Sequence, residues 1–152
     1  MRAVRAVSLT AALVLALMGS SAAGAMAAGQ KAKGSITVQN QGTLSFHASQ
    51  PSGGGFEITN SPYGTLVGNV TCYVPGTSSG GTKTAAFTGV ITKGPNTGKY
   101  YTVYLEDATS GDARSGDTFI VEDRNTTMNP GCPVARDLTP TPATSTGYIE
   151  IR

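Results

Sequence analysis

Polar and apolar residues alternate with a period of two through most of the chain after residue 33, and this pattern constrains the fold more than any other feature. Clusters of Gly, Asn, Ser and Pro interrupt it at short intervals. This combination is typical of short antiparallel strands joined by turns, and no stretch shows the 3.6-residue period of a helix. The eight predicted strands are residues 35–39, 43–49, 56–60, 65–74, 84–93, 100–106, 118–123 and 146–151.

Eight short strands predict an all-β fold, either an antiparallel up-and-down barrel or a two-layer sandwich. Gly68 and Gly89 fall inside strands, where glycine permits the sharp coiling used at barrel corners. If the last strand pairs with an early one, no sheet edge stays open. These features favour the barrel.

The alternation also predicts which way the central strands face. The inward face of residues 65–74 is expected to hold Leu66, Gly68, Val70, Cys72 and Val74. Tyr73 and Tyr104 are then expected on the outer face, where they are candidates for a shallow strip that binds a polymer. The alternative is that tyrosine is simply a good strand former.

Cys72 and Cys132 are the only cysteines. In an exported protein an isolated pair most simply forms one disulfide. Closing a loop of about 60 residues stabilises the fold by roughly 4 kcal/mol in the chain-entropy model. A redox or metal pair is disfavoured because the C-x-x-C spacing is absent and only His47 could join as a further ligand.

The N-terminus has the features of a secretion signal. Arg2 and Arg5 precede an apolar run over residues 6–18, and small residues lead to Ala25 and Ala27. We expect a signal peptide over 1–27, a flexible leader over 28–33 and a single β domain over 34–152. The apolar run is shorter than the roughly 20 residues that a membrane span needs, so the mature chain is expected to be secreted, extracellular and not inserted in a membrane.

The charge of the mature chain excludes one class of partner. The precursor has 11 Lys and Arg residues and 9 Asp and Glu residues, and loss of Arg2 and Arg5 leaves 9 against 9, a net charge of zero. Nucleic acid and anionic lipid both require clustered basic residues. We therefore expect no nucleic-acid partner.

Acidic residues gather around the predicted turn between residues 106 and 118. Two carboxylates suffice for glycoside cleavage, but the chain has no Trp to line a sugar cleft, and Asp is favoured in turns because it accepts local backbone hydrogen bonds. The candidate ligands for calcium are Asp107, Asp112 and Asp117, although the EF-hand spacing is absent. No other cofactor is expected.

Nucleophilic hydrolysis is disfavoured by the histidine content. His47 is the only histidine, and alternation places it opposite the apolar residues of its strand, on a solvated face. No G-x-S-x-G motif accompanies it. A nucleophile needs an adjacent base and an acid that orients the base, so the chain is not expected to be an enzyme.

Several runs of residues share a pattern with known exported proteins. The runs are Gly68-Asn69-Val70-Thr71-Cys72, Ala86-Phe87-Thr88-Gly89-Val90-Ile91, Tyr101-Thr102-Val103, Asp107, Gly116-Asp117-Thr118-Phe119 and Cys132. The chain resembles, over most of its mature length, a widespread group of uncharacterised small exported proteins of high-GC Gram-positive bacteria. The resemblance implies secretion and an all-β fold, and it brings no settled activity.

A long connection with four prolines over residues 124–145 separates the last two predicted strands. Proline cannot donate to a ladder, and long loops without secondary structure in small domains tend to be functional or disordered. The leading hypothesis is a non-catalytic exported β-module that binds an extracellular protein or polymer, or has a structural role, at or outside the cell surface. The alternative is a secreted inhibitor of an extracellular enzyme that acts through loop 124–145. The inhibitory residues would then be Met128, Asn129, Pro130, Gly131 and Pro133. The sequence leaves the oligomeric state open.

Overall fold

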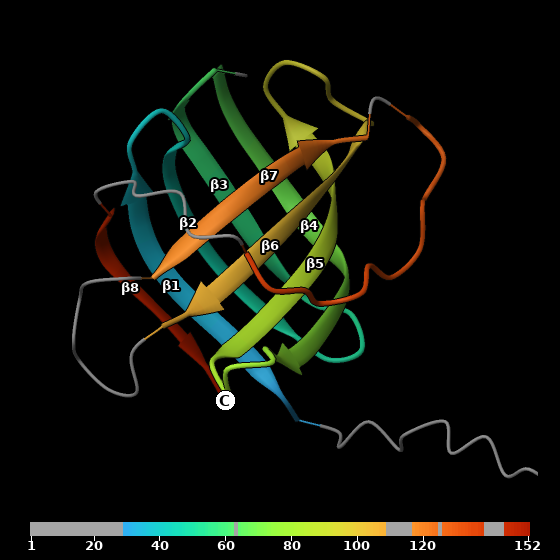
Figure 1. Ribbon diagram of the computed structural model, residues 1–152. Helices are drawn as coiled ribbons and strands as arrows, with labels where there is room; N and C mark the ends of the chain where they lie inside the picture. The colour runs from blue at the N-terminus through green and yellow to red at the C-terminus, as the bar shows by residue number, and fades with distance from the viewer. Residues whose placement is uncertain (1–28, 63, 109–116, 125, 139–144) are drawn as a thin grey trace, which may run out of the picture.

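The computed structural model describes residues 29–62, 64–108, 117–124, 126–138 and 145–152 (Figure 1). Its strands are β1 (Lys31–Val38), β2 (Gly42–Ser49), β3 (Gly54–Ser61), β4 (Gly64–Thr77), β5 (Lys83–Lys93), β6 (Tyr100–Asp107), β7 (Thr118–Asp123) and β8 (Ser145–Ile151). The described residues contain no helix, so the predicted all-β class is confirmed. The predicted signal peptide, with cleavage after Ala27, lies outside the described residues and stays a prediction.

The strands form one antiparallel sheet in the order β7-β6-β5-β4-β3-β2-β1-β8, and not a two-layer sandwich. Strands β1 to β7 follow one another as a meander, and β8 returns to pair with β1, so the last strand does pair with an early one. The sheet curls into a half-barrel around its core (Figure 1). Among the described residues no ladder joins the two edge strands, β7 and β8, so the expectation that pairing of the last strand leaves no open edge is wrong.

The first strand starts earlier than predicted. Lys31 and Lys33 were expected in a flexible leader, but both lie in β1, opposite Ser49 and His47 of β2. Lys31 also exchanges two backbone hydrogen bonds of 2.9 Å with Arg152. Pairing on both sides orders this segment, and its alternation of lysine with a buried alanine is itself a strand pattern.

One apolar core receives side chains from all eight strands. Phe87 lies at its centre, with ring centroids 5.9 Å from Phe46 and 5.4 Å from Phe56. A Cβ atom on Gly68 or Gly89 would lie 2.4 or 2.2 Å from the Phe56 ring. Both glycines therefore make room for an aromatic ring on the concave side of the sheet, because a larger residue would collide with it.

Side chains take the place of a ladder where β8 approaches the opposite end of the sheet; we call this junction the seam. The backbone N–H of Ile149 donates to Asp117 Oδ2 at 2.7 Å, and that of Ile151 donates to Asp107 Oδ2 at 3.2 Å. Lys83 Nζ donates to the carbonyl oxygen of Ile151 at 2.9 Å. Two carboxylates and one ammonium group thus bind the free edge of β8.

A β-bulge interrupts β4 at Thr71. Val70 lies opposite Gly89 of β5. The next paired residue of β4 is Cys72, opposite Thr88, so Thr71 is an extra residue that has no opposite residue in the ladder. An extra residue reverses the facing of every residue that follows it, because side chains alternate with a period of two.

The bulge makes three of the predicted orientations wrong. Cys72 and Val74 were expected inside the barrel, but they lie opposite Thr88 and Ala86 on the outer face. Tyr73 was expected outside, but it belongs to the core and is only 1% exposed. The alternation of the sequence runs unbroken through position 71, so it gave no sign of the bulge.

Candidate functional site

Residues 126–138, which we call the outer segment, lie across the outside of the sheet without forming a strand or a helix. Figure 1 shows this orange-red stretch passing in front of β4 and β5. The described part of the predicted proline-bearing connection, residues 126–138, is therefore irregular, as expected from its sequence. Several independent contacts hold it against the outer face.

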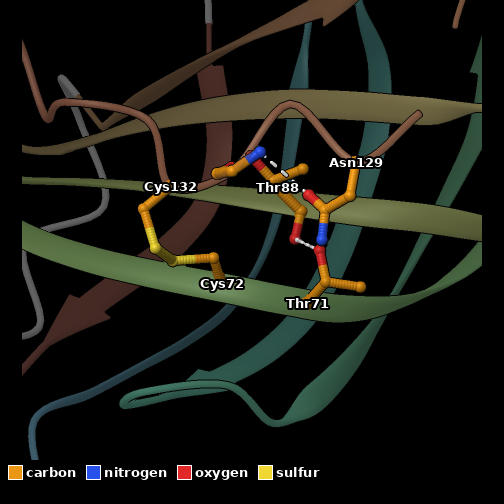
Figure 2. Close-up of a disulfide and its surroundings, with 6 residues drawn as sticks. Thr71, Cys72, Thr88, Asn129 and Cys132 are labelled. Carbon is orange, nitrogen blue, oxygen red and sulfur yellow. Dashed lines mark hydrogen bonds between the residues drawn. A yellow bond between two sulfur atoms is a disulfide. The ribbon is translucent and has the colours of Figure 1, made fainter.

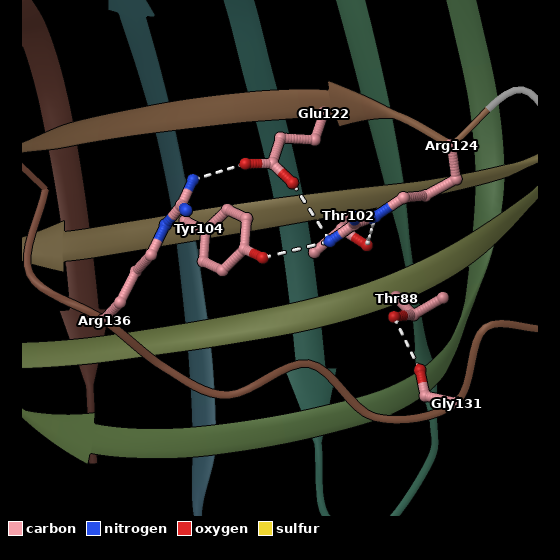
Figure 3. Close-up of polar contacts among 7 residues, drawn as sticks. All are labelled: Thr88, Thr102, Tyr104, Glu122, Arg124, Gly131 and Arg136. Atoms are coloured by element: carbon pink, nitrogen blue, oxygen red, sulfur yellow. Dashed lines mark hydrogen bonds and ion pairs between the residues drawn. The ribbon is translucent and has the colours of Figure 1, made fainter.

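The disulfide anchors the middle of the outer segment. Cys72 and Cys132 are bonded, with their Cα atoms 5.3 Å apart, so the predicted pairing is confirmed. Figure 2 shows the disulfide with Thr88 of β5 close by. Thr88 Oγ1 donates a hydrogen bond of 2.9 Å to the carbonyl oxygen of Gly131 (Figure 3). The bulge is what makes this possible, because it turns Cys72 outward toward the segment.

A stacked and ion-paired cluster anchors the segment further along (Figure 3). The guanidinium of Arg136 lies over the ring of Tyr104, 4.1 Å from its centroid, and pairs with Glu122. Arg124 pairs with Glu122 at 3.0 Å and donates to the Tyr104 hydroxyl at 3.1 Å. Arg124 Nε also donates to Thr102 Oγ1 at 3.1 Å. One face of the Tyr104 ring is thus covered by Arg136, and its hydroxyl accepts from Arg124. These contacts hold the side chain of Arg136 against the sheet.

Buried and polar contacts anchor the end of the segment. Leu138 is buried against Ala86 on the outer face of the sheet. Its backbone N–H donates to Glu106 Oε2 at 3.2 Å. The carboxylate of Asp137 accepts a hydrogen bond of 2.9 Å from Ser79 Oγ.

Between these anchors side-chain exposure alternates with a period of two, as in an extended chain: Pro133 and Ala135 are half-buried, and the residues on either side of them are exposed. Cys132 is bonded to Cys72, and Ala135 faces Gly76, where an added Cβ atom would lie 2.8 Å from the Ala135 Cβ. The stretch from Cys132 to Ala135 therefore runs alongside β4, from Cys72 toward Gly76.

The outer segment displays two large apolar side chains to solvent. Met128 is 78% exposed and Val134 is 81% exposed. Among the described residues, Tyr148 on β8, at 46%, is the other exposed large hydrophobic residue. Exposed apolar side chains on a backbone that is held in place are suited to contact a partner.

The backbone of the outer segment has two contrasting halves. In the first half, backbone N–H groups form hydrogen bonds with nearby side chains of the segment itself. The N–H of Met128 donates to Thr126 Oγ1 at 3.0 Å, and that of Gly131 donates to Asn129 Oδ1 at 2.9 Å. In residues 132–137, no backbone N–H or carbonyl group bonds to any other residue that the structure describes. The predicted inhibitory residues therefore lie mainly in the first half, where the backbone already forms hydrogen bonds within the segment.

The predicted tyrosine strip is not assembled. Tyr73 packs in the core opposite Phe87, whereas Tyr104 lies on the outer face, covered by Arg136 and only 5% exposed. Burial raises the pKa of Tyr73 to about 12, and its hydroxyl has no hydrogen-bond partner in the described chain. The two rings lie on opposite faces of the sheet and cannot contact one ligand side by side.

Two of the three predicted calcium ligands belong to the seam. Asp117 is 2% exposed and accepts hydrogen bonds from the N–H groups of Ala108, at 3.1 Å, and Ile149, at 2.7 Å. Asp107 accepts one from β8, and Asp112 lies outside the described residues. The described ranges hold no group of three His, Cys, Asp or Glu side chains that could bind a metal ion. The calcium site stays a prediction.

His47 lies in a pocket of about 180 Å³ on β8, β1 and β2, which was not predicted from the sequence. Ser49 and Glu150 also line it, so a hydroxyl, an imidazole and a carboxylate come together. Among the described residues, however, no hydrogen bond links His47 to either one. Glu150 pairs with Lys33 at 3.2 Å and with Arg152. Burial raises the Glu150 pKa, but these two cations outweigh it and lower the pKa below its ordinary value.

Within the described ranges, no helix is long and apolar enough to cross a membrane. Comparison with known proteins finds no matching family model, no matching curated protein and no matching solved structure.

Proposed function

We propose that this chain is an exported, non-catalytic β-module that binds an extracellular protein at or outside the cell surface through its outer segment. The observation that carries the proposal is a segment without secondary structure that is anchored at positions 132, 136 and 138 and still exposes Met128 and Val134. Anchoring lowers the conformational entropy lost on binding, and apolar side chains supply contact area. A protein partner fits these side chains better than a hydrophilic polymer does.

Export is supported by the sequence of residues 1–27 and by the disulfide. The charged start, apolar run and small residues match a signal peptide. Disulfides persist mainly in oxidising compartments outside the cytosol. Membership of the group of small exported proteins that the sequence resembles is part of the same proposal.

A non-catalytic role is supported by the engagement of the carboxylates. Glu150 is paired with two cations, and Asp117 accepts hydrogen bonds from two backbone N–H groups. Neither carboxylate orients His47 as a base, which nucleophilic hydrolysis would require.

The test is capture of partners from culture fluid and cell envelope of the producing organism, with the mature protein as bait. A photo-crosslinking residue at Val134 should label a protein that the same residue at Tyr148 does not label. After purification, this labelled partner should bind the wild-type protein and the Tyr148→Lys variant with the same affinity. Met128→Lys and Val134→Lys should each weaken binding by about 30-fold, the loss of a strong contact residue.

The matched control is Tyr148→Lys, which also replaces an exposed apolar side chain but lies on β8. Equal binding by the double variant Met128→Lys/Val134→Lys would remove the outer segment from the interface. A second candidate function, inhibition of an extracellular enzyme, is favoured by the backbone of residues 132–137, which forms no hydrogen bond with the described part of the chain.

A further inference from the structure

We infer that residues 131–135 occupy the substrate cleft of an extracellular serine protease whose specificity pocket is small and apolar, with Val134 in that pocket. The inference rests on the proposed function, because it names the partner of the same outer segment. It is carried by three features: an unpaired extended backbone, one exposed small aliphatic side chain, and anchors on both sides of it.

The backbone of this stretch is free to form the hydrogen bonds that a cleft offers. An extended peptide that adds to an exposed strand edge is held by main-chain hydrogen bonds, and pockets that take alternate side chains give specificity. The N–H and carbonyl groups of Cys132 and Val134 bond to no described residue. Extended residues of the sheet, in contrast, have these groups paired with a neighbouring strand.

The conformation is held before binding. Pro133 fixes its own φ near −65° and restricts Cys132 to an extended conformation. The disulfide then fixes the position of Cys132 on the sheet. A partner therefore meets an extended segment that is already held in place, and little conformational entropy remains to be lost.

The side chain defines the class of protease. Val134 is 81% exposed, whereas its neighbours Pro133 and Ala135 are half-buried against the sheet. A valine side chain fits a small pocket of the elastase type and leaves a deep aromatic or cationic pocket unfilled. Elastase-type enzymes are thus the expected target.

Two other exposed side chains are poorer anchors for geometric reasons. The N–H of Met128 is already bonded to Thr126, in a bend of the chain, so the backbone at Met128 cannot lie as a strand in a cleft. The guanidinium of Arg136 is stacked on Tyr104 and paired with Glu122. A trypsin-type pocket would have to disrupt that cluster to accept Arg136.

The anchors also explain why binding would give inhibition and not turnover. Hydrolysis of the bond between Val134 and Ala135 adds one water and leaves a carboxyl group on Val134 and an amino group on Ala135. The disulfide holds one new end, and Ala135 and Leu138 on the sheet hold the other. The two ends stay adjacent at high effective concentration, which favours resealing over release.

The test is titration of the mature, disulfide-intact protein against active-site-titrated elastase-type, trypsin-type and chymotrypsin-type serine proteases. We expect stoichiometric loss of elastase-type activity and inhibition of the other two that is weaker by about 100-fold, the discrimination that pocket shape gives. Val134→Arg should lose elastase-type inhibition and gain trypsin-type inhibition. A gain of this kind cannot result from misfolding.

Stability and capture controls separate this inference from the proposed function. Val134→Arg should melt at the wild-type temperature, since the side chain is solvent-exposed. Unimpaired activity of the elastase-type enzyme, or rapid and complete cleavage after Val134, would overturn the inference. If an extracellular partner is nevertheless crosslinked at Val134, the proposed function stands and only the protease assignment fails.

Discussion

Two regions of this molecule hold backbone in place without a β-ladder, and they do so by different means. At the seam, Asp107, Asp117 and Lys83 bind the free edge of β8 beside the core. On the outer face, a disulfide and a stacked arginine bind a segment that covers little of the core. We therefore expect the seam to contribute to global stability, and the outer segment to open around its disulfide while the sheet stays folded.

The largest expected effect tests the seam. Asp117→Ala leaves the N–H groups of Ala108 and Ile149 without their acceptor and should lower the free energy of unfolding by about 3–5 kcal/mol. Asp117→Asn keeps one oxygen acceptor and should cost less. Denaturant unfolding measures both. Asp137→Ala, which removes a surface carboxylate of the outer segment, is the matched control and should change stability by less than about 1 kcal/mol. Similar losses for Asp117→Ala and Asp137→Ala would abolish the distinction between the two regions.

The next effect tests the tether. Replacing Cys72 and Cys132 together with Ala should lower the free energy of unfolding by about 2–5 kcal/mol, since the unfolded chain regains its freedom. Cleavage by a broad-specificity protease should rise most between residues 124 and 145, while the β-rich circular dichroism spectrum persists at low temperature. The native protein should contain no titratable thiol. A double variant as resistant as wild type would show that the other anchors suffice.

Alkaline pH tests whether the core is independent of the outer segment. The pKa of Tyr73 is raised by burial to about 12, above its unfolded value. The stabilisation due to its neutral form is therefore fully present below pH about 10 and is lost as the pH rises through about 12. A shift of this size corresponds to roughly 3 kcal/mol. Tyr73→Phe should abolish this part of the alkaline loss.

Repeating this titration on a variant that lacks the disulfide tests more sharply whether the core and the outer segment are independent. If the outer segment opens without the core, Tyr73 should keep its raised pKa in the Cys72→Ala/Cys132→Ala variant. Ultraviolet titration measures this pKa, at a temperature where the variant and the wild type are both folded. Tyr148→Phe, at an exposed tyrosine, should leave the alkaline loss of stability unchanged. A normal pKa for Tyr73 in the variant would show that loss of the disulfide loosens the core as well.

The smallest effect concerns the stacked cluster. Arg136→Met removes both the contact with Tyr104 and the pair with Glu122, and it should lower stability by about 0.5–1 kcal/mol. Arg136→Lys retains the charge and should recover only part of the loss, because an ammonium group cannot stack as a planar guanidinium does. Amide hydrogen exchange at residues 134–137 should accelerate more than exchange in β6. Equal acceleration in both would mean that the cluster also supports the sheet.

The candidate site could be predicted only in part. The prolines of residues 124–145 predicted an irregular segment, and two lone cysteines predicted its tether. The stacking of Arg136 on Tyr104 and the unpaired backbone of residues 132–137 could not be predicted, because they depend on how the segment crosses the sheet. For the same reason the sequence did not predict Val134 as the exposed contact residue. It lies one position beyond the last predicted inhibitory residue, Pro133.

The sequence by itself determined the class of fold, the approximate strands and the disulfide partners of this protein. Alternation and turn residues act within a few positions along the chain, so they can be interpreted without knowledge of the fold. The tertiary structure alone decided the bulge at Thr71, which set the faces of Cys72 and Tyr73, and the side-chain closure of the seam. Both features depend on which strand lies opposite. A bulge exists only relative to its partner strand, and the seam carboxylates can contact β8 only after the sheet has curled.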